Sequence, residues 1–246
     1  MELIYRKNYS VRNCDVDCLG QLKTSMILFY AQDAAGGHCN ELALDYDTLA
    51  SRRLFWAVIR HRVQVTRMPK CGENITVETW PMPTTRVAYP RSMVAYDQQG
   101  NELFRSISLW ILMDLDTRAM ILPGKSGVAV PGLIRGSELA APPSLTPKVL
   151  QNIRSRTVSF TDLDRNGHMN NCRYIDWTMD LLPSAFHRSH QLKEFIVCYL
   201  NEAREGDLLE LQWAIAEDGS IRIDGNRPEG EMSAGYSRVF SVQALY

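Results

Sequence analysis

Two ten-residue stretches, DVDCLGQLKT at residues 15–24 and DLDRNGHMNN at residues 162–171, align with each other without a gap. The identical positions are Asp15 and Asp162, Asp17 and Asp164, and Gly20 and Gly167. So short a match is weak evidence by itself, and the order of the surrounding segments decides its meaning. In each copy a strand-like segment leads into the turn, and a helix-like segment follows. The sequence therefore predicts one structural unit used twice.

Candidate strands follow the helix-like segment in both halves of the chain. They alternate apolar positions and are rich in Val, Ile, Phe and Trp. The expected strands are residues 55–67, 73–81, 86–97, 102–114, 194–204, 207–217, 220–225 and 236–245. Turn sequences stand at corresponding joints, KCGEN and DQQGNE in the first half and REGD and RPEGE in the second. Each half is thus expected to form an antiparallel sheet.

The helix expected at residues 21–35 is apolar on nearly every side, so we expect it to be buried all round. The second helix carries an apolar stripe, which core packing explains, and Pro183 is expected to end it. The stripe consists of Tyr174, Ile175, Thr178, Met179 and Leu182. An antiparallel sheet wrapped around a long central helix is the hotdog arrangement. The predicted fold class is therefore α+β, with two tandem hotdog domains.

Residues 122–150 are rich in glycine and proline, as expected of a linker crossing the surface. We expect an N-terminal domain at residues 1–121 and a C-terminal domain at residues 151–246. A chain of 246 residues is long enough for two fused small domains with sizeable cores.

Composition excludes several classes of protein. A net charge of −1 gives no global attraction to nucleic acid or to an anionic membrane. The six cysteines are scattered without a CxxC pair, which favours free thiols in a reducing cytosol over a zinc site or disulfide framework. The N-terminal segment lacks the apolar region of a signal peptide, and the apolar runs are too short to cross a bilayer. We expect a cytoplasmic protein without a membrane span.

The second copy of the turn carries polar side chains that the first copy lacks. Asn166 and His168 stand where the first copy has Leu19 and Gln21. Asp164 has an aspartate counterpart in the first copy and is therefore also explained as scaffold. The spacing places Asp164, Asn166 and His168 on one face of an extended segment. Because an imidazole titrates near neutral pH, His168 is a candidate acid–base group.

A catalytic histidine needs a partner, and the helix that follows offers further chemistry. The N-cap of that helix is expected at Asn170 or Asn171. Backbone N–H groups at its start would then suit a developing oxyanion. The candidate acidic partners are Glu202, Glu205 and Asp207, and the residues alone do not choose among them. Glu202 lies further inside a strand, where a carboxylate is more costly.

The remaining histidines have ordinary explanations. His187 and His190 are three residues apart, but no Cys or carboxylate stands nearby at a ligand-like spacing, so we expect no metal. Solvated or capping roles suffice for His38 and His61. The DLDRNG segment does not continue as a calcium-binding EF-hand loop, because its twelfth position is Arg173.

The segment SFTDLDRNGHMNNCRYIDW resembles the motif D-x-N-x-H-V-N-N of the acyl-acyl-carrier-protein thioesterases of plants and bacteria. The resemblance extends over nearly the whole chain, including LFWAVIRHRVQVTRMPKCGENITVETW and SISLWILMDLDTRAMILP, and this family has two tandem hotdog domains. Asp164, Asn166 and His168 match its catalytic Asp, Asn and His. The segment YLNEAREGD resembles Y-R-R-E-C-G-R-D in plant members, so Glu202 matches the family's Glu. Ala203 replaces the Cys of those members, which argues against a cysteine nucleophile.

The resemblance implies hydrolysis of fatty acyl-acyl-carrier-protein to free fatty acid and holo carrier protein, without metal or organic cofactor. Glu202 or Asp164 would activate water or attack the carbonyl, while Asn166 and His168 orient the reactants. The first domain would hold the acyl chain, with a chain length that the sequence does not specify. The alternatives are an acyl-CoA thioesterase, a hotdog dehydratase or hydratase, and a non-catalytic acyl-binding protein.

The expected partner is an acyl carrier protein charged with a fatty acyl thioester, and a second copy of the chain is left open. Because such carriers are acidic, a basic patch should receive them, although solvated surface charge explains the same residues equally well. The candidate residues are Arg52, Arg53, Arg60, Arg62 and Lys70.

Overall fold

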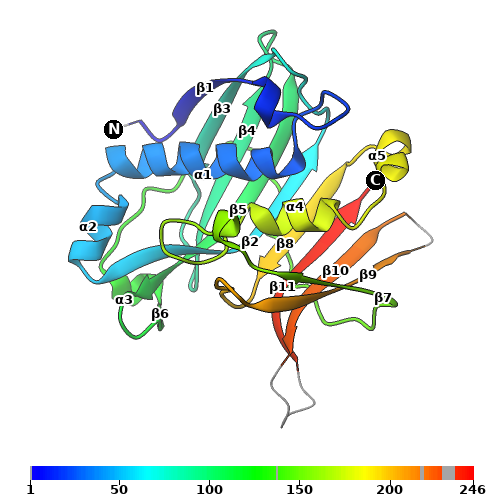
Figure 1. Ribbon diagram of the computed structural model, residues 1–246. Helices are drawn as coiled ribbons and strands as arrows, with labels where there is room; N and C mark the ends of the chain where they lie inside the picture. Colours follow the sequence, from blue (N-terminus) through cyan, green and yellow to red (C-terminus); the bar gives the residue numbers. More distant parts are fainter. Residues whose placement is uncertain (1, 137, 217–218, 229–235) are drawn as a thin grey trace. The chain divides into compact units, whose positions relative to one another are not determined.

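The computed structural model describes residues 2–136, 138–216, 219–228 and 236–246 (Figure 1). The chain divides into two compact units, Met1–Pro142 and Pro143–Tyr246. Each contains one antiparallel sheet with helices against it, so the predicted tandem α+β fold is confirmed. In the described residues, no helix is long and apolar enough to cross a membrane.

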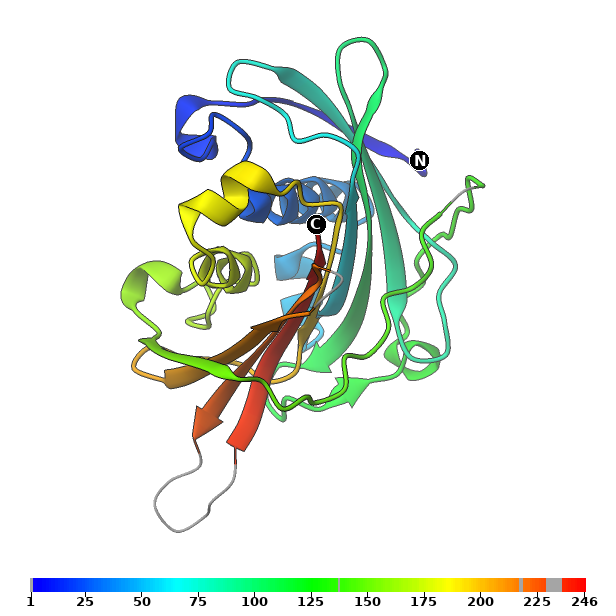
Figure 2. The same cartoon turned by 90° about the vertical axis from the view of Figure 1, so that its right-hand side faces the viewer.

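In the first unit the strands pair in the order β1-β3-β4-β5-β2, and the short β6 pairs with β5. Its elements are β1 (Tyr5–Ser10), α1 (Thr24–Glu41), α2 (Tyr46–Ser51), β2 (Leu54–Val65), β3 (Asn74–Pro81), β4 (Tyr89–Tyr96), β5 (Glu102–Asp114), β6 (Met120–Ile121) and α3 (Pro123–Ser126). The long helix α1 lies across one face of this sheet (Figures 1 and 2). The four strands expected in the first half are confirmed.

The helix α1 is longer than expected and is not buried all round. Its buried residues recur every three or four positions and form one face, which packs on the sheet. They are Ser25, Ile27, Leu28, Tyr30, Ala31, Ala34, Ala35 and His38. Gln32, Asp33 and Asn40 on the other side are exposed. A Cβ on Gly37 would lie 2.4 Å from the Tyr5 hydroxyl, so this glycine allows the helix to continue close to β1.

The second unit is a five-stranded sheet in the order β8-β11-β10-β9-β7. Its elements are β7 (Asn152–Thr157), α4 (Arg173–Met179), α5 (Ser184–Ser189), β8 (Glu194–Tyr199), β9 (Leu208–Ile215), β10 (Ile221–Pro228) and β11 (Tyr236–Leu245). The four strands expected in the second half are present, but β8 ends at Tyr199, so Glu202 lies after this strand and not inside it as expected. Residue 217 of one expected strand and residues 229–231 of the expected RPEGE turn lie outside the described residues.

The second unit's helix is shorter than a long central helix. It has seven residues, ends at Met179, and is followed by a turn that leads into α5 at Pro183. Core packing explains its apolar side, as expected, because Tyr174 lies 4.8 Å from Phe240 between ring centroids and Trp177 is fully buried.

Residues 122–150, the expected linker, make contacts with each unit. Arg135 forms an ion pair of 2.6 Å with Glu78 and lies over the ring of Trp80, both on β3. Further along, the carbonyl of Thr146 accepts a hydrogen bond of 2.9 Å from Arg222 on β10. Each part of the linker is thus held by the unit to which it belongs.

The solvated roles expected for two histidines are wrong. His38 on α1 is fully buried, with Nε2 at 3.2 Å from the carbonyl of Glu2. His61 on β2 is also buried, with Nε2 at 3.0 Å from the Ser106 hydroxyl. Burial lowers the pKa of His61 to about 3, so its imidazole is neutral at pH 7.

Candidate active site

The polar cluster of the second copy lies on a tight turn that its own carboxylate closes. Asp164 Oδ1 accepts hydrogen bonds from the backbone N–H of Asn166, at 2.8 Å, and of His168, at 3.3 Å. The N–H of Asp164 donates to the carbonyl of His168 at 2.8 Å. Gly167 has a φ of 74°, a backbone conformation that favours glycine. The local sequence therefore explains why this turn forms.

Backbone pairing brings the turn against the segment that follows β8. The N–H of Met169 donates to the carbonyl of Ala203 at 2.8 Å, and His168 forms a bridge with Arg204. As a result, His168 Nε2 lies 3.2 Å from Glu202 Oε2. The His168 side chain is 17% exposed and that of Glu202 is 40% exposed, so water reaches the pair. The arrangement is an imidazole–carboxylate pair open to solvent on one side.

The structure distinguishes the three acidic candidates. In the described part of the chain, Glu202 is the one whose carboxylate forms an ion pair with His168. The Asp207 side chain instead accepts a hydrogen bond of 2.8 Å from the N–H of Arg204 and pairs with Arg227. Glu205 is exposed on the same turn. Geometry thus supports Glu202, which the residues alone left among three candidates and which the family resemblance singled out.

Asp164 and Asn166 hold different positions in the cluster. One oxygen of Asp164 is committed to the turn, and the other lies 3.4 Å from the side-chain amide of Asn166. Asn166 is exposed. Asp164 therefore has a structural task that is complete without any substrate, whereas His168 and Glu202 face each other.

Asn170 makes the side-chain contact expected of an N-cap, although the regular helix α4 begins at Arg173 with Cys172 before it. The side chain of Asn170 accepts from the N–H of Cys172 at 3.0 Å, and its carbonyl accepts from the N–H of Arg173 at 2.8 Å. The carbonyl of Asn171 accepts from the hydroxyl of Tyr199 at 3.0 Å. The N–H groups of Cys172 and Arg173 are thus bonded within the turn, and an oxyanion role for the start of the helix stays a prediction.

The two cysteines of this region pack as small hydrophobic residues. Cys172 is fully buried, and burial raises the pKa of its thiol. Cys198 is 1% exposed and clusters with Leu145 and Ile196. Ala203, which replaces the cysteine of plant relatives, is also fully buried. A buried thiol in this unit is poorly suited to act as a nucleophile.

The described residues contain no group of three or more His, Cys, Asp and Glu side chains that could hold a metal ion. The His187 and His190 pair makes local contacts. His187 Nε2 lies 3.1 Å from the carbonyl of Met179, and His190 stacks on Phe186 with ring centroids 4.0 Å apart.

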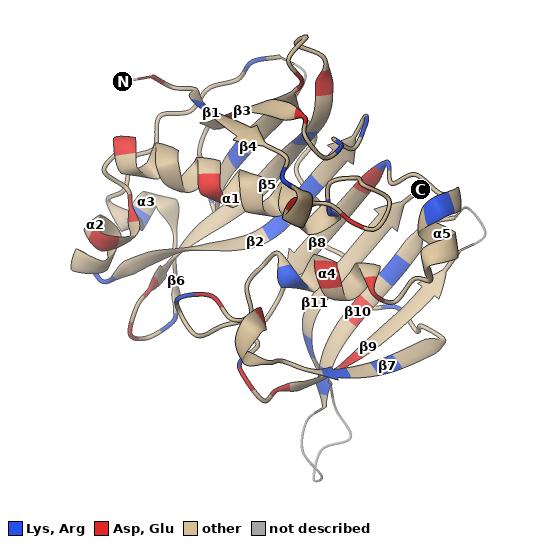
Figure 3. Ribbon diagram, turned by 45° about the horizontal axis from the view of Figure 1, so that its top comes forward, with Lys and Arg blue, Asp and Glu red and all other residues tan. Residues whose placement is uncertain are grey.

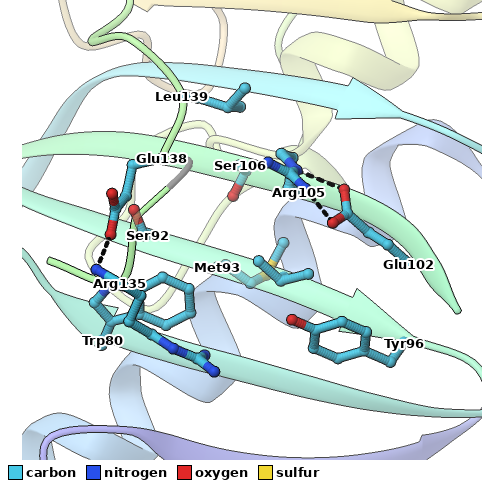
Figure 4. A pocket seen from close by; sticks show the side chains of 11 residues that line it. Trp80, Ser92, Met93, Tyr96, Glu102, Arg105, Ser106, Arg135, Glu138 and Leu139 are labelled. Atoms are coloured by element: carbon cyan, nitrogen blue, oxygen red, sulfur yellow. Dashed lines mark hydrogen bonds and ion pairs between the residues drawn. The ribbon is translucent and has the colours of Figure 1, made fainter. Parts of the chain in front are cut away.

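A separate pocket of about 140 Å³ lies in the first unit, between strands β3, β4 and β5 and residues 135, 138 and 139 of the linker (Figure 4). Its charged side chains are paired with one another or with neighbours. Arg105 binds Glu102, and Arg135 binds Glu78 and, through its backbone N–H, Glu138. None of the four expected site residues lines this pocket. Its contacts anchor the linker to the sheet.

The expected basic patch is partly used within its own unit. Arg52 donates to the carbonyl of Ser126 at 3.0 Å, Arg53 pairs with Asp116, and Arg60 donates to the carbonyl of Pro142. Figure 3 shows Lys and Arg positions interspersed with Asp and Glu positions in both units. The patch stays a prediction.

Two antiparallel sheets, each with a helix on one face and an imidazole–carboxylate pair in the second, define a double hotdog protein. The chain belongs to the acyl-ACP thioesterase family. Residues 2–122 match the acyl-ACP thioesterase N-terminal domain and residues 147–234 match the C-terminal domain. The suspected resemblance is thereby confirmed.

Similar proteins support the family and the fold. A palmitoyl-acyl carrier protein thioesterase of Gossypium hirsutum is 24% identical over 89% of this chain and 56% of the relative. A dodecanoyl-[acyl-carrier-protein] hydrolase of Cinnamomum camphora is 25% identical over 85% of the chain and 58% of the relative. The chain therefore spans little more than half the length of these curated relatives.

Solved structures share the fold. The crystal structure of an acyl-ACP thioesterase from Bacteroides thetaiotaomicron matches with a TM-score of 0.88 and 22% identity over 98% of this chain and 97% of the other. The 12:0-ACP thioesterase from Umbellularia californica matches with a TM-score of 0.83 and 22% identity over 100% and 97% of the two chains.

Proposed function

We propose that this chain is a thioesterase that hydrolyses fatty acyl-acyl-carrier-protein to free fatty acid and holo carrier protein. The observation that carries the proposal is the 3.2 Å contact between His168 and Glu202 beside a solvent-accessible turn. Family membership supplies the substrate class, since relatives of this chain are named for acyl carrier protein substrates. The acyl chain length is left to experiment.

The proposed catalytic residues are Asp164, Asn166, His168 and Glu202, with unequal tasks. Glu202 takes a proton from water as the water oxygen adds to the thioester carbonyl. His168 holds the carboxylate in place, receives the proton that Glu202 took from water, and delivers it to the sulfur when the carbon–sulfur bond breaks, which leaves free fatty acid and carrier thiol. The exposed amide of Asn166 orients the water. Asp164 keeps the turn closed, and this assignment favours Glu202 over Asp164 as the base.

We assign the two domains different parts of this reaction. Residues 1–121 would receive the acyl chain, residues 122–150 link the domains, and residues 151–246 carry the catalytic side chains. Partly buried Met26 and Phe29 on α1 leave apolar surface in the first domain, which supports an acyl-binding role. The acyl carrier protein is the proposed partner.

The proposed compartment is the cytoplasm. The six cysteines are free thiols, and three of them, Cys14, Cys18 and Cys71, are exposed. A reducing compartment keeps such thiols reduced. No metal or organic cofactor takes part in the proposed reaction.

The first experiment measures thiol release by purified protein from acyl carrier protein and acyl-CoA substrates of several chain lengths, offered side by side. We expect faster release from the carrier-protein substrates, and the preferred chain length gives the acyl specificity. Release from CoA substrates alone would keep the chemistry and change the partner. If folded protein releases no thiol from either donor, the proposal is contradicted. A non-catalytic acyl-binding protein would give this result.

A further inference from the structure

Arg227, near the end of β10, contacts the segment that carries Glu202. Its Nη2 donates to the backbone carbonyl of Glu202 at 2.6 Å and to Asp207 Oδ2 at 2.6 Å. One guanidinium nitrogen therefore joins two points of the chain that are five residues apart in sequence. Both contacts are charge-assisted or directed at a backbone carbonyl, and a planar guanidinium holds such geometry well.

The far end of the same segment is also fixed. Asp207 Oδ2 accepts a hydrogen bond of 2.8 Å from the N–H of Arg204, and the N–H of Asp207 donates to the carbonyl of Arg204 at 3.0 Å. The N–H of Gly206 donates to the carbonyl of Val158 at 2.9 Å. Arg227 thus connects the backbone of Glu202 to a turn that is itself hydrogen-bonded to the segment at Val158.

The corresponding turn of the first unit is held differently: among the described residues, the structure shows no arginine there that bonds both the acidic side chain and the backbone carbonyl five residues before it, as Arg227 does. There Glu73 takes the place of Asp207, because its side chain accepts from the N–H of Lys70 at 2.9 Å. Its arginine partner, Arg67, belongs to the same turn and binds the Glu73 carboxylate at 2.8 Å. The carboxylate of Glu73 is therefore held by an arginine close to it in sequence, whereas that of Asp207 is bound by Arg227 from another strand.

These contacts hold the backbone of Glu202, whose carboxylate pairs with His168.

We propose that Arg227 is a positioning residue for Glu202, which it holds at the distance needed for the contact with His168. The inference rests on the proposed function, because Glu202 has to take part in the reaction. Arg227 acts through Glu202 and does not touch the substrate. Its loss should therefore lower kcat and leave KM nearly unchanged.

The test is a double-mutant cycle of Arg227→Gln and Glu202→Gln, with kcat and KM measured for each variant. We expect Arg227→Gln alone to lower kcat on the order of tenfold, since a small displacement of a reacting group is costly. In the Glu202→Gln background the same change should cost less than about twofold, because the group that Arg227 positions is already lost. Arg227→Lys should recover part of the rate.

The matched control is Arg67→Gln. This change removes the arginine that binds Glu73 in the corresponding turn of the first unit, and it should leave kcat unchanged. Thermal unfolding of every variant separates loss of fold from loss of positioning, and Arg227→Lys serves if Arg227→Gln does not fold. Normal kcat in folded Arg227→Gln, or an equal loss in both backgrounds, would overturn the inference. Full activity of Glu202→Gln would instead overturn the proposed base, and this inference with it.

Discussion

The two Asp-containing turns of this chain share a backbone design and differ in chemistry. In the first, Asp17 Oδ1 accepts from the N–H of Leu19 at 2.8 Å and of Gln21 at 3.1 Å. In the second, Asp164 Oδ1 makes the two corresponding bonds. Gly20 has a φ of 72°, close to that of its counterpart in the second turn. The repeated aspartate and glycine are thus scaffold.

The two turns also dock in the same way. The N–H of Leu22 donates to the carbonyl of Pro69 at 2.8 Å, as Met169 does to Ala203. In this alignment Met68 occupies the position of Glu202. The first turn therefore has a thioether and an amide where the second has a carboxylate and an imidazole. The comparison teaches that a few side chains on a duplicated scaffold create the candidate site.

The largest difference between the turns should appear when the residue four positions after Asp17 or Asp164 is changed. His168→Ala should lower the rate of thioester hydrolysis at least about a hundredfold, because a positioned acid–base group is lost. Gln21→Ala, the matched change in the first turn, should leave the rate within about twofold. Steady-state kinetics on both folded variants would check this, and near-normal turnover by His168→Ala would remove the imidazole from the mechanism.

The imidazole of His61 in the first unit is buried, in contrast to the solvent-accessible imidazole of His168 in the second. His61 is buried and its pKa is lowered to about 3, so the folded state resists its protonation. The unfolded chain binds this proton near pH 6.5, and stability is therefore lost as the pH falls below that value. Between pH 6.5 and 4.5 the loss should be roughly 2–3 kcal/mol.

This loss can be measured by denaturant unfolding at several pH values. His61→Asn, which has no titrating group, should show a smaller decline in unfolding free energy over the same range. Parallel declines in the variant and the unchanged protein would mean that carboxylates, and not His61, govern acid sensitivity.

The two glycines should matter equally for stability and unequally for activity. Gly20→Ala and Gly167→Ala each force a side chain into the left-handed region, at a cost of about 1–2 kcal/mol. Only Gly167→Ala should also lower the hydrolysis rate, since it distorts the turn that carries His168. If both substitutions lowered kcat equally after correction for stability, the assignment of the chemistry to the second turn would be contradicted.

A smaller effect is expected from Asp164→Asn, because the amide oxygen can still accept the two backbone hydrogen bonds. We expect less than about a tenfold loss of rate if Asp164 is scaffold, as its counterpart Asp17 indicates. A loss of a hundredfold or more in a folded variant would make Asp164 the base in place of Glu202.

The smallest effect should follow Ala203→Cys. This position is fully buried, and burial raises the pKa of a thiol, so a cysteine here should change the rate by less than about twofold. Kinetics before and after treatment with a thiol-blocking reagent would test this. A large gain in rate that the reagent abolishes would restore a cysteine mechanism.

The local features of this protein follow directly from its amino-acid sequence. Strand alternation, turn glycines and the repeated aspartates act over a few residues, so the strands of both sheets and the duplicated turn could be predicted. The motif around His168 was visible for the same reason. The continuation of α1 was missed because Gly36 and Gly37 disfavour a helix locally, although the close approach of Tyr5 requires Gly37.

Contacts between groups far apart in the sequence depend on how the strands and turns pack in three dimensions. The residues alone do not separate Glu202 from Glu205 and Asp207. The family resemblance points to Glu202, and backbone pairing places its carboxylate against His168. The burial of His61 and the reach of Arg227 depend on strands far apart in sequence. Periodicity reports the environment of a residue's own element, whereas partner choice depends on how elements are registered against one another.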